Sequence, residues 1–288
     1  MSEAWITLAT NDSYANGALT LHQSLIESKT TRRIHCLITN DVSPSVREQL
    51  EAKFDVVTLV DVFDSRDSVN LELIGRPDLG VTFTKLHCWR LTQYTKAVFL
   101  DADTMVLQNS DELFSHPDFS AVADIGWPDM FNSGVFVFSP SLETYKALVA
   151  LAVSKGSFDG GDQGLLNEYY SNWRDLPSAH RLPFIYNMTA GAFYSYAAAF
   201  KRFGPATKIV HFIGATKPWS SGSDTIHQHQ HYRQWHQFSE KAHAPFTAPH
   251  EQFDDKNARR EAWEAGNPDY LGKDAFANIK KALDKSLE

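Results

Sequence analysis

The chain has 288 residues, of which 43% are hydrophobic, and its formal net charge is -8 at pH 7. Its mean hydropathy of -0.34 is typical of a soluble protein with one large core. The negative charge argues against a protein that binds a nucleic-acid backbone, which requires a concentrated basic surface. The sequence contains neither a secretory signal pattern nor an apolar run long enough to cross a bilayer, so we expect a cytoplasmic protein without a membrane partner.

The first part of the chain alternates between apolar strands and helices. The pattern predicts strands over Trp5–Ala9, Ile34–Ile38 and Val56–Val60, separated by helices that begin after Thr10–Ser13 and at Ser43-Pro44. This alternation predicts an α/β fold in which helices flank a mainly parallel central sheet. We expect an irregular excursion over Asp61–Gly80 and a helix over Thr84–Leu91. Cys36 and Cys88 lack metal-ligand spacing and are predicted to be reduced core thiols.

The segment that follows ends in a pair of aspartates. Ala97–Leu100 predicts a fully buried strand, and Asp101 and Asp103 fall at its carboxyl end, where ligands bind in open α/β sheets. Two carboxylates separated by the small Ala102 can reach one hard cation, and their oxygens favour Mg²⁺ or Mn²⁺. The alternative is that the two aspartates only cap a turn or the next helix.

The second half of the chain repeats the pattern of strand and helix. We expect strands over Phe119–Ala123, Val135–Phe138 and Lys208–Ile213, a helix that begins at Ser139-Pro140-Ser141, and a glycine-rich loop over Gly156–Gly164. Ile226–Phe238 is rich in histidine. A solvated helix packed by Tyr232, Trp235 and Phe238 is the favoured interpretation, and metal binding by its histidines is the alternative.

The carboxyl-terminal region changes in composition. We predict a large folded domain over 1–242, a linker over 243–260 and a terminal amphipathic helix over 261–288. Phe276, Ile279, Leu283 and Leu287 form an apolar stripe on this helix. The stripe predicts binding to a partner, and docking onto the chain's own domain is the alternative.

Polar residues cluster where several predicted strands end. These residues can share one site if the strand ends meet at one edge of the sheet. They are Thr10, Asn11, Asp101, Asp103, His211, Gly214 and Lys217. Carboxylates with an imidazole suit Mn²⁺, a lysine suits a diphosphate, and Tyr14 can stack on a base. The dinucleotide fingerprint and the P-loop motif do not occur. The pattern therefore indicates a nucleoside diphosphate bridged by a metal.

Several stretches together resemble a known family. They include TLATNDSYANGA, VFLDADTMVL, GWPDMFNSGVFVF, GSFDGGDQGLLN and KIVHFIGATKPW. Over Thr7–Trp219 the chain resembles the self-glucosylating glycogen primers of glycosyltransferase family 8. The tail WEAGNPDYLGKDAFANIKKALD resembles the segment with which these proteins bind glycogen synthase.

The resemblance implies a glycosyltransferase-A-type fold and a homodimer. It also implies retaining transfer of glucose from UDP-glucose to the protein's own tyrosine and then to the growing α-1,4-glucan, which primes glycogen synthase. The acceptor would be Tyr194, with Tyr196 as the alternative. Two other functions stay open: a family member that acts on a separate acceptor, and a non-catalytic scaffold for glycogen synthase.

The resemblance also assigns residues. Asp101, Asp103 and His211 would bind Mn²⁺, with Mg²⁺ as the alternative metal. The catalytic group would comprise Lys85, Asp159, Asp162 and Gln163. The residues implied to hold UDP-glucose are Leu8, Thr10, Asn11, Tyr14, Arg76, Lys85, Asp101, Ala102, Asp103, Asn132, Ser133, Asp159, Asp162, Gln163, His211, Gly214 and Lys217. Asp162 would be either the nucleophile of a double displacement or a group that positions the sugar for attack from the leaving-group face.

Overall fold

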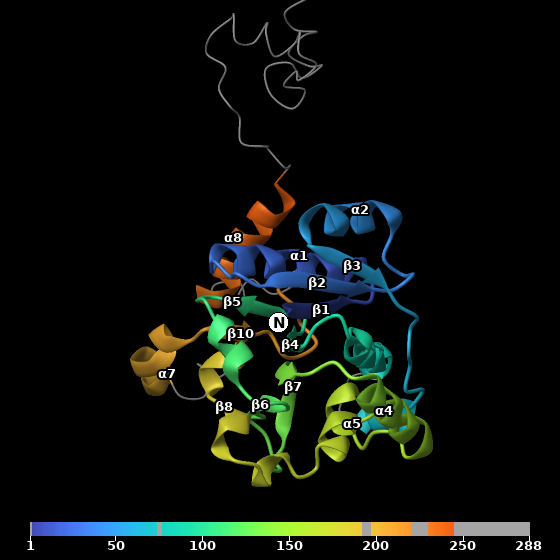
Figure 1. Cartoon of the computed structure of the whole chain (residues 1–288). Coiled ribbons are helices and arrows are strands. Elements are labelled where there is room, and N and C mark those ends of the chain that lie inside the picture. The colour runs from blue at the N-terminus through green and yellow to red at the C-terminus, as the bar shows by residue number, and fades with distance from the viewer. Residues whose placement is uncertain (1, 74–76, 192–196, 221–229, 245–288) are drawn as a thin grey trace, which may run out of the picture. The chain divides into compact units, whose positions relative to one another are not determined.

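The structure is a computed structural model that describes residues 2–73, 77–191, 197–220 and 230–244 (Figure 1). The density of contacts along the chain separates one unit over Met1–Ala242 from a second over His243–Glu288. Almost all described residues belong to the first unit. Nearly all of the predicted linker and the whole terminal helix over 261–288 lie outside the described residues.

The elements alternate along the chain as follows. The described strands are β1 (Glu3–Ala9), β2 (Arg33–Ile38), β3 (Val56–Leu59), β4 (Lys96–Leu100), β5 (Thr104–Val106), β6 (Ser120–Ala123), β7 (Phe131–Phe138), β8 (Arg181–Leu182), β9 (Met188–Thr189) and β10 (Ile209–His211). The described α-helices are α1 (Asp12–Glu27), α2 (Pro44–Lys53), α3 (Ser68–Leu73), α4 (Leu142–Ser154), α5 (Asp162–Tyr169), α7 (Ala197–Phe203) and α8 (Gln230–His243). The described 3₁₀ helices are η1 (Pro77–Arg90), η2 (Asp111–Ser115), η3 (Trp173–Asp175), η4 (Ser178–His180), η5 (Phe184–Tyr186) and η6 (Gly204–Ala206).

The main sheet has the strand order β3-β2-β1-β4-β7-β6-β8. The pairs β3–β2, β2–β1, β1–β4 and β6–β8 are parallel, whereas β7 runs antiparallel to both β4 and β6. The carboxyl ends of β1 and β4 therefore lie at the same edge of the sheet, as do the loops that follow them. This mainly parallel α/β architecture confirms the fold class predicted from the sequence.

Helices cover both faces of the main sheet because its central strands are apolar on both sides (Figure 1). Along β4, Val98 and Leu100 pack in one core with residues of α1 and α2. Ala97 and Phe99 pack in the other core with residues of η1, α4 and α5. The period of two in a strand thus assigns neighbouring residues of β4 to opposite cores.

A second, three-stranded sheet has the order β5-β10-β9. The condition that all the strand ends meet at one edge of the main sheet is not met, because β10 does not belong to that sheet. It instead pairs antiparallel with β5, with His211 opposite Thr104. Since β5 begins directly after Asp103, this pairing brings a distant segment next to the two aspartates.

Three other local predictions need correction. The expected irregular excursion over 61–80 contains α3, which buries Leu71 beside Gly160. The helix expected over Thr84–Leu91 is the 3₁₀ helix η1, which begins earlier in the chain, at Pro77. The strand expected over Val135–Phe138 begins earlier, at Phe131, so Asn132, Ser133 and Gly134 lie within β7. In each case tertiary contacts outweigh the local pattern.

Within the described ranges, no helix combines the length and the apolar character of a membrane span.

Cys36 and Cys88 are free and buried, as predicted. Burial raises the pKa of both thiols. His22 and His35 are among the buried histidines: His35 bonds to Tyr94 and Thr58, while His22 packs against Phe54. Burial lowers the pKa of His35 to about 4. Burial, together with the nearby Lys53, lowers the pKa of His22 to about 4.

These buried histidines make the free energy of unfolding depend on pH. The unfolded chain protonates both rings near their ordinary pKa of about 6.5, whereas the folded protein resists protonation down to about pH 4. The stabilisation is therefore complete above about pH 6.5 and is lost as the pH falls towards 4. At about pH 5.5, each ring should lower the free energy of unfolding by about 1.4 kcal/mol relative to its value above about pH 6.5.

Urea unfolding of the wild type and of His35→Gln at about pH 7.5 and pH 5.5 measures this effect. The wild type should lose more stability than the variant between the two pH values, because the variant lacks one protonating ring. An equal loss in both proteins would show that His35 does not remain neutral in the folded state.

Candidate active site

The two aspartates lie in a short turn between β4 and β5. Backbone bonds hold this turn: Asp101 N donates to Gly134 O over 2.9 Å, and Thr104 N donates to Asp101 O over 2.9 Å. The Thr104 hydroxyl also donates to Asp101 O over 2.8 Å. The turn fixes both carboxylates at the carboxyl end of β4, and Asp103 is buried.

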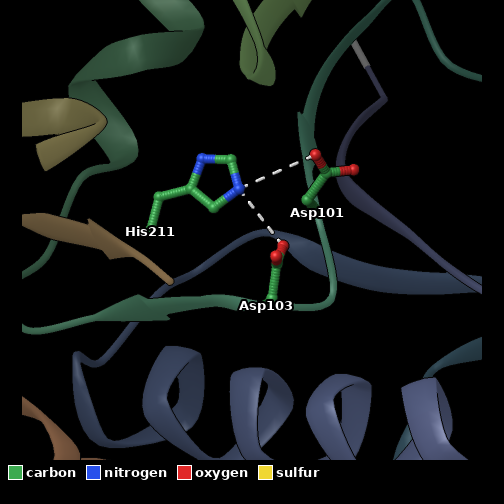
Figure 2. Close-up of side chains that lie close together, drawn as sticks. All are labelled: Asp101, Asp103 and His211. Carbon is green, nitrogen blue, oxygen red and sulfur yellow. Dashed lines mark ion pairs between the residues drawn. The ribbon is translucent and has the colours of Figure 1, made fainter. Parts of the chain in front are cut away.

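His211 completes this cluster from β10. Its Nε2 lies 3.2 Å from Asp103 Oδ1 and 3.9 Å from Asp101 Oδ2 (Figure 2). The ligand atoms of the three residues all lie within 4.8 Å of one another. Two carboxylate oxygens and an imidazole nitrogen at this spacing form a set of ligands that suits Mn²⁺ or Mg²⁺. We refer to these three residues as the acidic triad.

The far side of the His211 ring supports the same conclusion. Its Nδ1 lies 2.9 Å from Asn187 Oδ1, and Asn187 Nδ2 donates to Asn132 Oδ1 over 2.8 Å. Because the amide oxygen of Asn187 can only accept, Nδ1 donates to it, and Nε2 is the ring nitrogen that faces the carboxylates and would bind a cation. This is the arrangement expected of a metal-binding histidine with an outer partner. Gly134 makes room for the ring, since a Cβ there would lie 2.2 Å from His211 Cε1.

Two buried lysines neutralise the carboxylates around the triad. Lys85 Nζ lies 2.9 Å from Asp101 Oδ1 and 2.6 Å from Asp162 Oδ2, and Lys217 Nζ pairs with Asp103 Oδ2. Burial opposes the positive charge on Lys85, but Asp101 and Asp162 outweigh this effect and raise the pKa of Lys85. Burial likewise opposes ionisation of Asp103, but His211 and Lys217 outweigh it and lower the pKa of that carboxyl well below its usual range. Burial raises the pKa of the Asp101 carboxyl, although Lys85 opposes this effect, whereas Lys85 and Asp103 are held in their charged forms.

The loop before α5 brings further polar groups to this region. Asp159 Oδ1 accepts from the Ser157 hydroxyl over 2.7 Å, from Gly161 N over 2.9 Å and from Gly164 N over 3.1 Å. This oxygen therefore shapes the glycine-rich loop that carries Asp162. The predicted loop ends at Gly161, because α5 begins at Asp162 itself.

Gln163 connects this loop with two other segments. Its Oε1 accepts from Ser133 N over 3.2 Å, and its Nε2 donates to Asp124 Oδ2 over 3.2 Å. Asn132 Nδ2 donates to the same Asp124 oxygen over 3.0 Å. Asp124 directly follows β6, so it holds two predicted sugar-binding residues in place from a third strand.

The edge of β1 provides the remaining predicted residues. Asn11 caps α1 by accepting from Tyr14 N over 3.0 Å, and Thr10 O accepts from Thr39 over 2.7 Å. Tyr14 contacts Trp219 edge to face at 5.5 Å, and Trp219 Nε1 donates to the Ser13 hydroxyl over 2.8 Å. Trp219 follows Lys217 by two residues and so fixes that segment against α1.

The structure brings most of the predicted site residues to one region. The acidic triad, Lys85, Lys217 and Asp162 form one connected set of contacts, and Asn132, Ser133 and Gln163 adjoin it. Leu8 and Ala102 are buried, and Gly214 has the positive φ of 114° that favours glycine. Arg76, Tyr194 and Tyr196 lie outside the described residues.

Sequence reasoning did not identify Asp124, Asn187 and Trp219 as members of the site. Asp124 follows a predicted strand, which is a signal that could have identified it. Asn187 has no local signal, because its role depends on the distant His211.

The triad yields a prediction for the metal. Asp103→Asn should weaken Mn²⁺ binding by more than about 10-fold, because even changes in outer partners of ligands cost about 10–100-fold. Electron paramagnetic resonance titration of Mn²⁺ with UDP present measures this affinity. Asp175→Asn, which alters a side chain that is 73% exposed, serves as the control and should leave the affinity unchanged. Equal affinity in Asp103→Asn and wild type would contradict the metal assignment.

The contact between α1 and the aspartate turn yields a second prediction. A Cβ at Gly17 would lie 2.5 Å from Ala102 O and 2.6 Å from the Trp219 ring. Gly17→Ala should therefore displace both segments, at a cost of about 1–3 kcal/mol, and weaken UDP binding measured by calorimetry. Gly191→Ala is the control, since a Cβ there meets nothing within 4 Å. Unchanged UDP affinity in Gly17→Ala would show that these contacts do not shape the nucleotide site.

Comparisons with known proteins agree with this geometry. Residues 5–223 match the model of glycosyl transferase family 8. The chain is 72% identical over 235 residues to glycogenin-1 of Caenorhabditis elegans, and the match covers 82% of this chain and 54% of that protein. It is 44% identical over 330 aligned positions to glycogenin-1 of Mus musculus, with 99% of each chain covered.

A solved structure supports the fold alone. The galactosyltransferase LgtC in complex with donor and acceptor sugar analogues has a TM-score of 0.60 and 18% identity, with 86% of this chain and 98% of that chain covered. Together with the family match, this likeness confirms the predicted glycosyltransferase-A-type fold. The chain belongs to glycosyltransferase family 8 and, within that family, to the glycogenins.

Proposed function

We propose that the protein is a metal-dependent, retaining glucosyltransferase that transfers glucose from UDP-glucose to its own tyrosine and then to the growing α-1,4-glucan. The observation that carries the proposal is the acidic triad, with Lys217 on one side and the Lys85–Asp162 pair on the other. A cation site between a lysine and a buried carboxylate suits a sugar diphosphate. The identity of 72% and 44% to two glycogenins supports this choice of reaction.

The leaving group is the diphosphate of UDP, whose negative charge grows as the bond to glucose breaks. A Mn²⁺ ion held by the triad would act as a Lewis acid that neutralises this charge. Lys217 contributes a second positive charge, and it is buried between Asp103 and the Phe212 carbonyl, to which it donates over 3.1 Å. A lysine held in this way needs little reordering to contact a phosphate.

Asp162 is the carboxylate that we assign to the sugar. It is 6% exposed, its Oδ2 lies 2.6 Å from Lys85 Nζ, and its backbone N donates to the Thr82 hydroxyl over 3.0 Å. A double displacement requires an ionised nucleophile, and attack from the leaving-group face requires an ionised group that stabilises positive charge on the sugar. Lys85 therefore places a positive charge directly against this carboxylate.

The partners follow from the same proposal. We assign Tyr194 as the acceptor, the terminal helix over 261–288 as the segment that binds glycogen synthase, and the cytoplasm as the compartment. We further propose a homodimer, in which one subunit can glucosylate the tyrosine of the other.

Deleting the tail from Ala262 onwards should spare self-glucosylation and remove binding to glycogen synthase, as measured by co-purification.

Intact mass spectrometry tests the proposed activity. Protein from a host without UDP-glucose is incubated with UDP-glucose and Mn²⁺, as wild type, Tyr194→Phe and Tyr196→Phe. Wild type and Tyr196→Phe should show a ladder of added hexoses, whereas Tyr194→Phe should show none, because it lacks the acceptor hydroxyl.

Other patterns would contradict parts of the proposal. If Tyr194→Phe shows a ladder and Tyr196→Phe does not, the acceptor is Tyr196. The absence of a ladder in wild type, together with hydrolysis of UDP-glucose, would identify an enzyme that uses a separate acceptor. The absence of both would identify a non-catalytic scaffold.

A further inference from the structure

The loop between β6 and β7 exposes a large apolar surface. Trp127 is 91% exposed and Ile125 is 61% exposed. The buried tryptophans of the described chain, each 3% exposed or less, are Trp5, Trp89, Trp173 and Trp235. A tryptophan that stays exposed does not contribute the large favourable free energy that its burial would give. An exposed aromatic side chain of this kind marks a binding surface.

The base of this loop belongs to the candidate active site. Asp124 N donates to Met130 O over 2.9 Å, which closes the loop, and Gly126 N donates to Asp124 Oδ1 over 2.8 Å. The other oxygen of Asp124 accepts from Asn132 and Gln163, as described above. Ile125 and Trp127 thus rise from a closed loop that is attached to the residues assigned to the donor sugar.

We propose that Ile125 and Trp127 form a platform on which the glucan acceptor stacks as it extends away from the transfer site. This inference rests on the proposed function, because it needs an acceptor that is a chain of glucose units. The faces of glucose rings that carry only C–H groups are apolar, and they pack against aromatic rings as other apolar surfaces do. A closed loop also presents the indole with little ordering cost on binding.

The charges of the loop favour a neutral, hydroxyl-rich ligand. The ionisable side chains of residues 124–130 are Asp124 and Asp129, and both are acidic. Carboxylates accept hydrogen bonds from sugar hydroxyls but repel phosphates and the anionic surface of a membrane. A second copy of this chain is the remaining occupant, and the test below distinguishes it.

The platform has a consequence that separates the two stages of the reaction. The first glucose is transferred to a tyrosine, which does not need a surface that holds several sugars. Later glucoses are transferred to a glucan long enough to reach Trp127. Loss of the indole should therefore impair elongation and leave the first transfer unchanged.

Binding is tested first, without any turnover. The full chain is labelled with 5-fluorotryptophan, which replaces its seven tryptophans, and is titrated with maltotetraose while ¹⁹F spectra are recorded. The Trp127 resonance is assigned by its absence in Trp127→Phe. We expect this resonance to shift and to saturate, whereas those of the buried tryptophans should not move. A Trp127 resonance that does not respond would overturn the proposal even if the protein glucosylates itself.

Kinetics provide the second test. Trp127→Ala should raise KM for maltotetraose about 10-fold, equivalent to about 1.4 kcal/mol, and Trp127→Phe should restore part of the loss. The rate of the first transfer to unglucosylated protein and KM for UDP-glucose should equal those of wild type. Phe203→Ala, which removes an aromatic side chain that is 65% exposed on α7, is the matched control and should behave as wild type.

Two kinetic outcomes would overturn the proposal. The first is an unchanged KM for maltotetraose in Trp127→Ala. The second is an equal loss in Trp127→Ala and Phe203→Ala. Sedimentation of the same variants identifies the other occupant: a change of oligomeric state in Trp127→Ala with unchanged maltotetraose binding would assign the platform to contact between copies of the chain.

Discussion

The mutual neutralisation of buried charges at the carboxyl end of β4 is the constraint on which the rest of the site depends. Asp103 and Asp162 are buried, and each contacts a buried lysine, so neither carboxylate lacks a partner. Removing one partner of such a pair is strongly destabilising, because it leaves a charge without compensation. In the same arrangement, His211 and Lys217 hold the pKa of the Asp103 carboxyl well below its usual range.

This charge cluster exists because of one sheet pairing. The turn after β4 leads directly into β5, and β5 pairs with β10, so that His211 arrives opposite Thr104 and beside Asp103. Gly134 on β7 leaves space for the imidazole, and Asn187 orients it. Segments that are about a hundred residues apart in sequence thus supply one candidate metal site through backbone register.

The sequence predicts the parts of this arrangement that have local signals. The apolar run of β4 and the two aspartates that end it indicate both a buried strand and a metal site, and the structure places His211 beside them. The second sheet and the outer partner Asn187 have no such signal, because their roles arise from pairing between distant segments. The resemblance to a family compensates for part of this gap, since it assigned Lys85 and Asp162 to the catalytic group, and the structure brings the two into contact.

The central claim is that Asp101, Asp103 and His211 hold a divalent cation beside Lys217, where the diphosphate of the donor binds. The most direct measurement is a crystal structure of the protein with Mn²⁺ and UDP, with anomalous diffraction recorded at the manganese edge. We predict one strong anomalous peak within about 2.0–2.3 Å of an oxygen of each aspartate and of His211 Nε2, with a diphosphate oxygen as a further ligand. A peak that is absent or that lies away from these side chains, in crystals that contain bound UDP, would contradict the account.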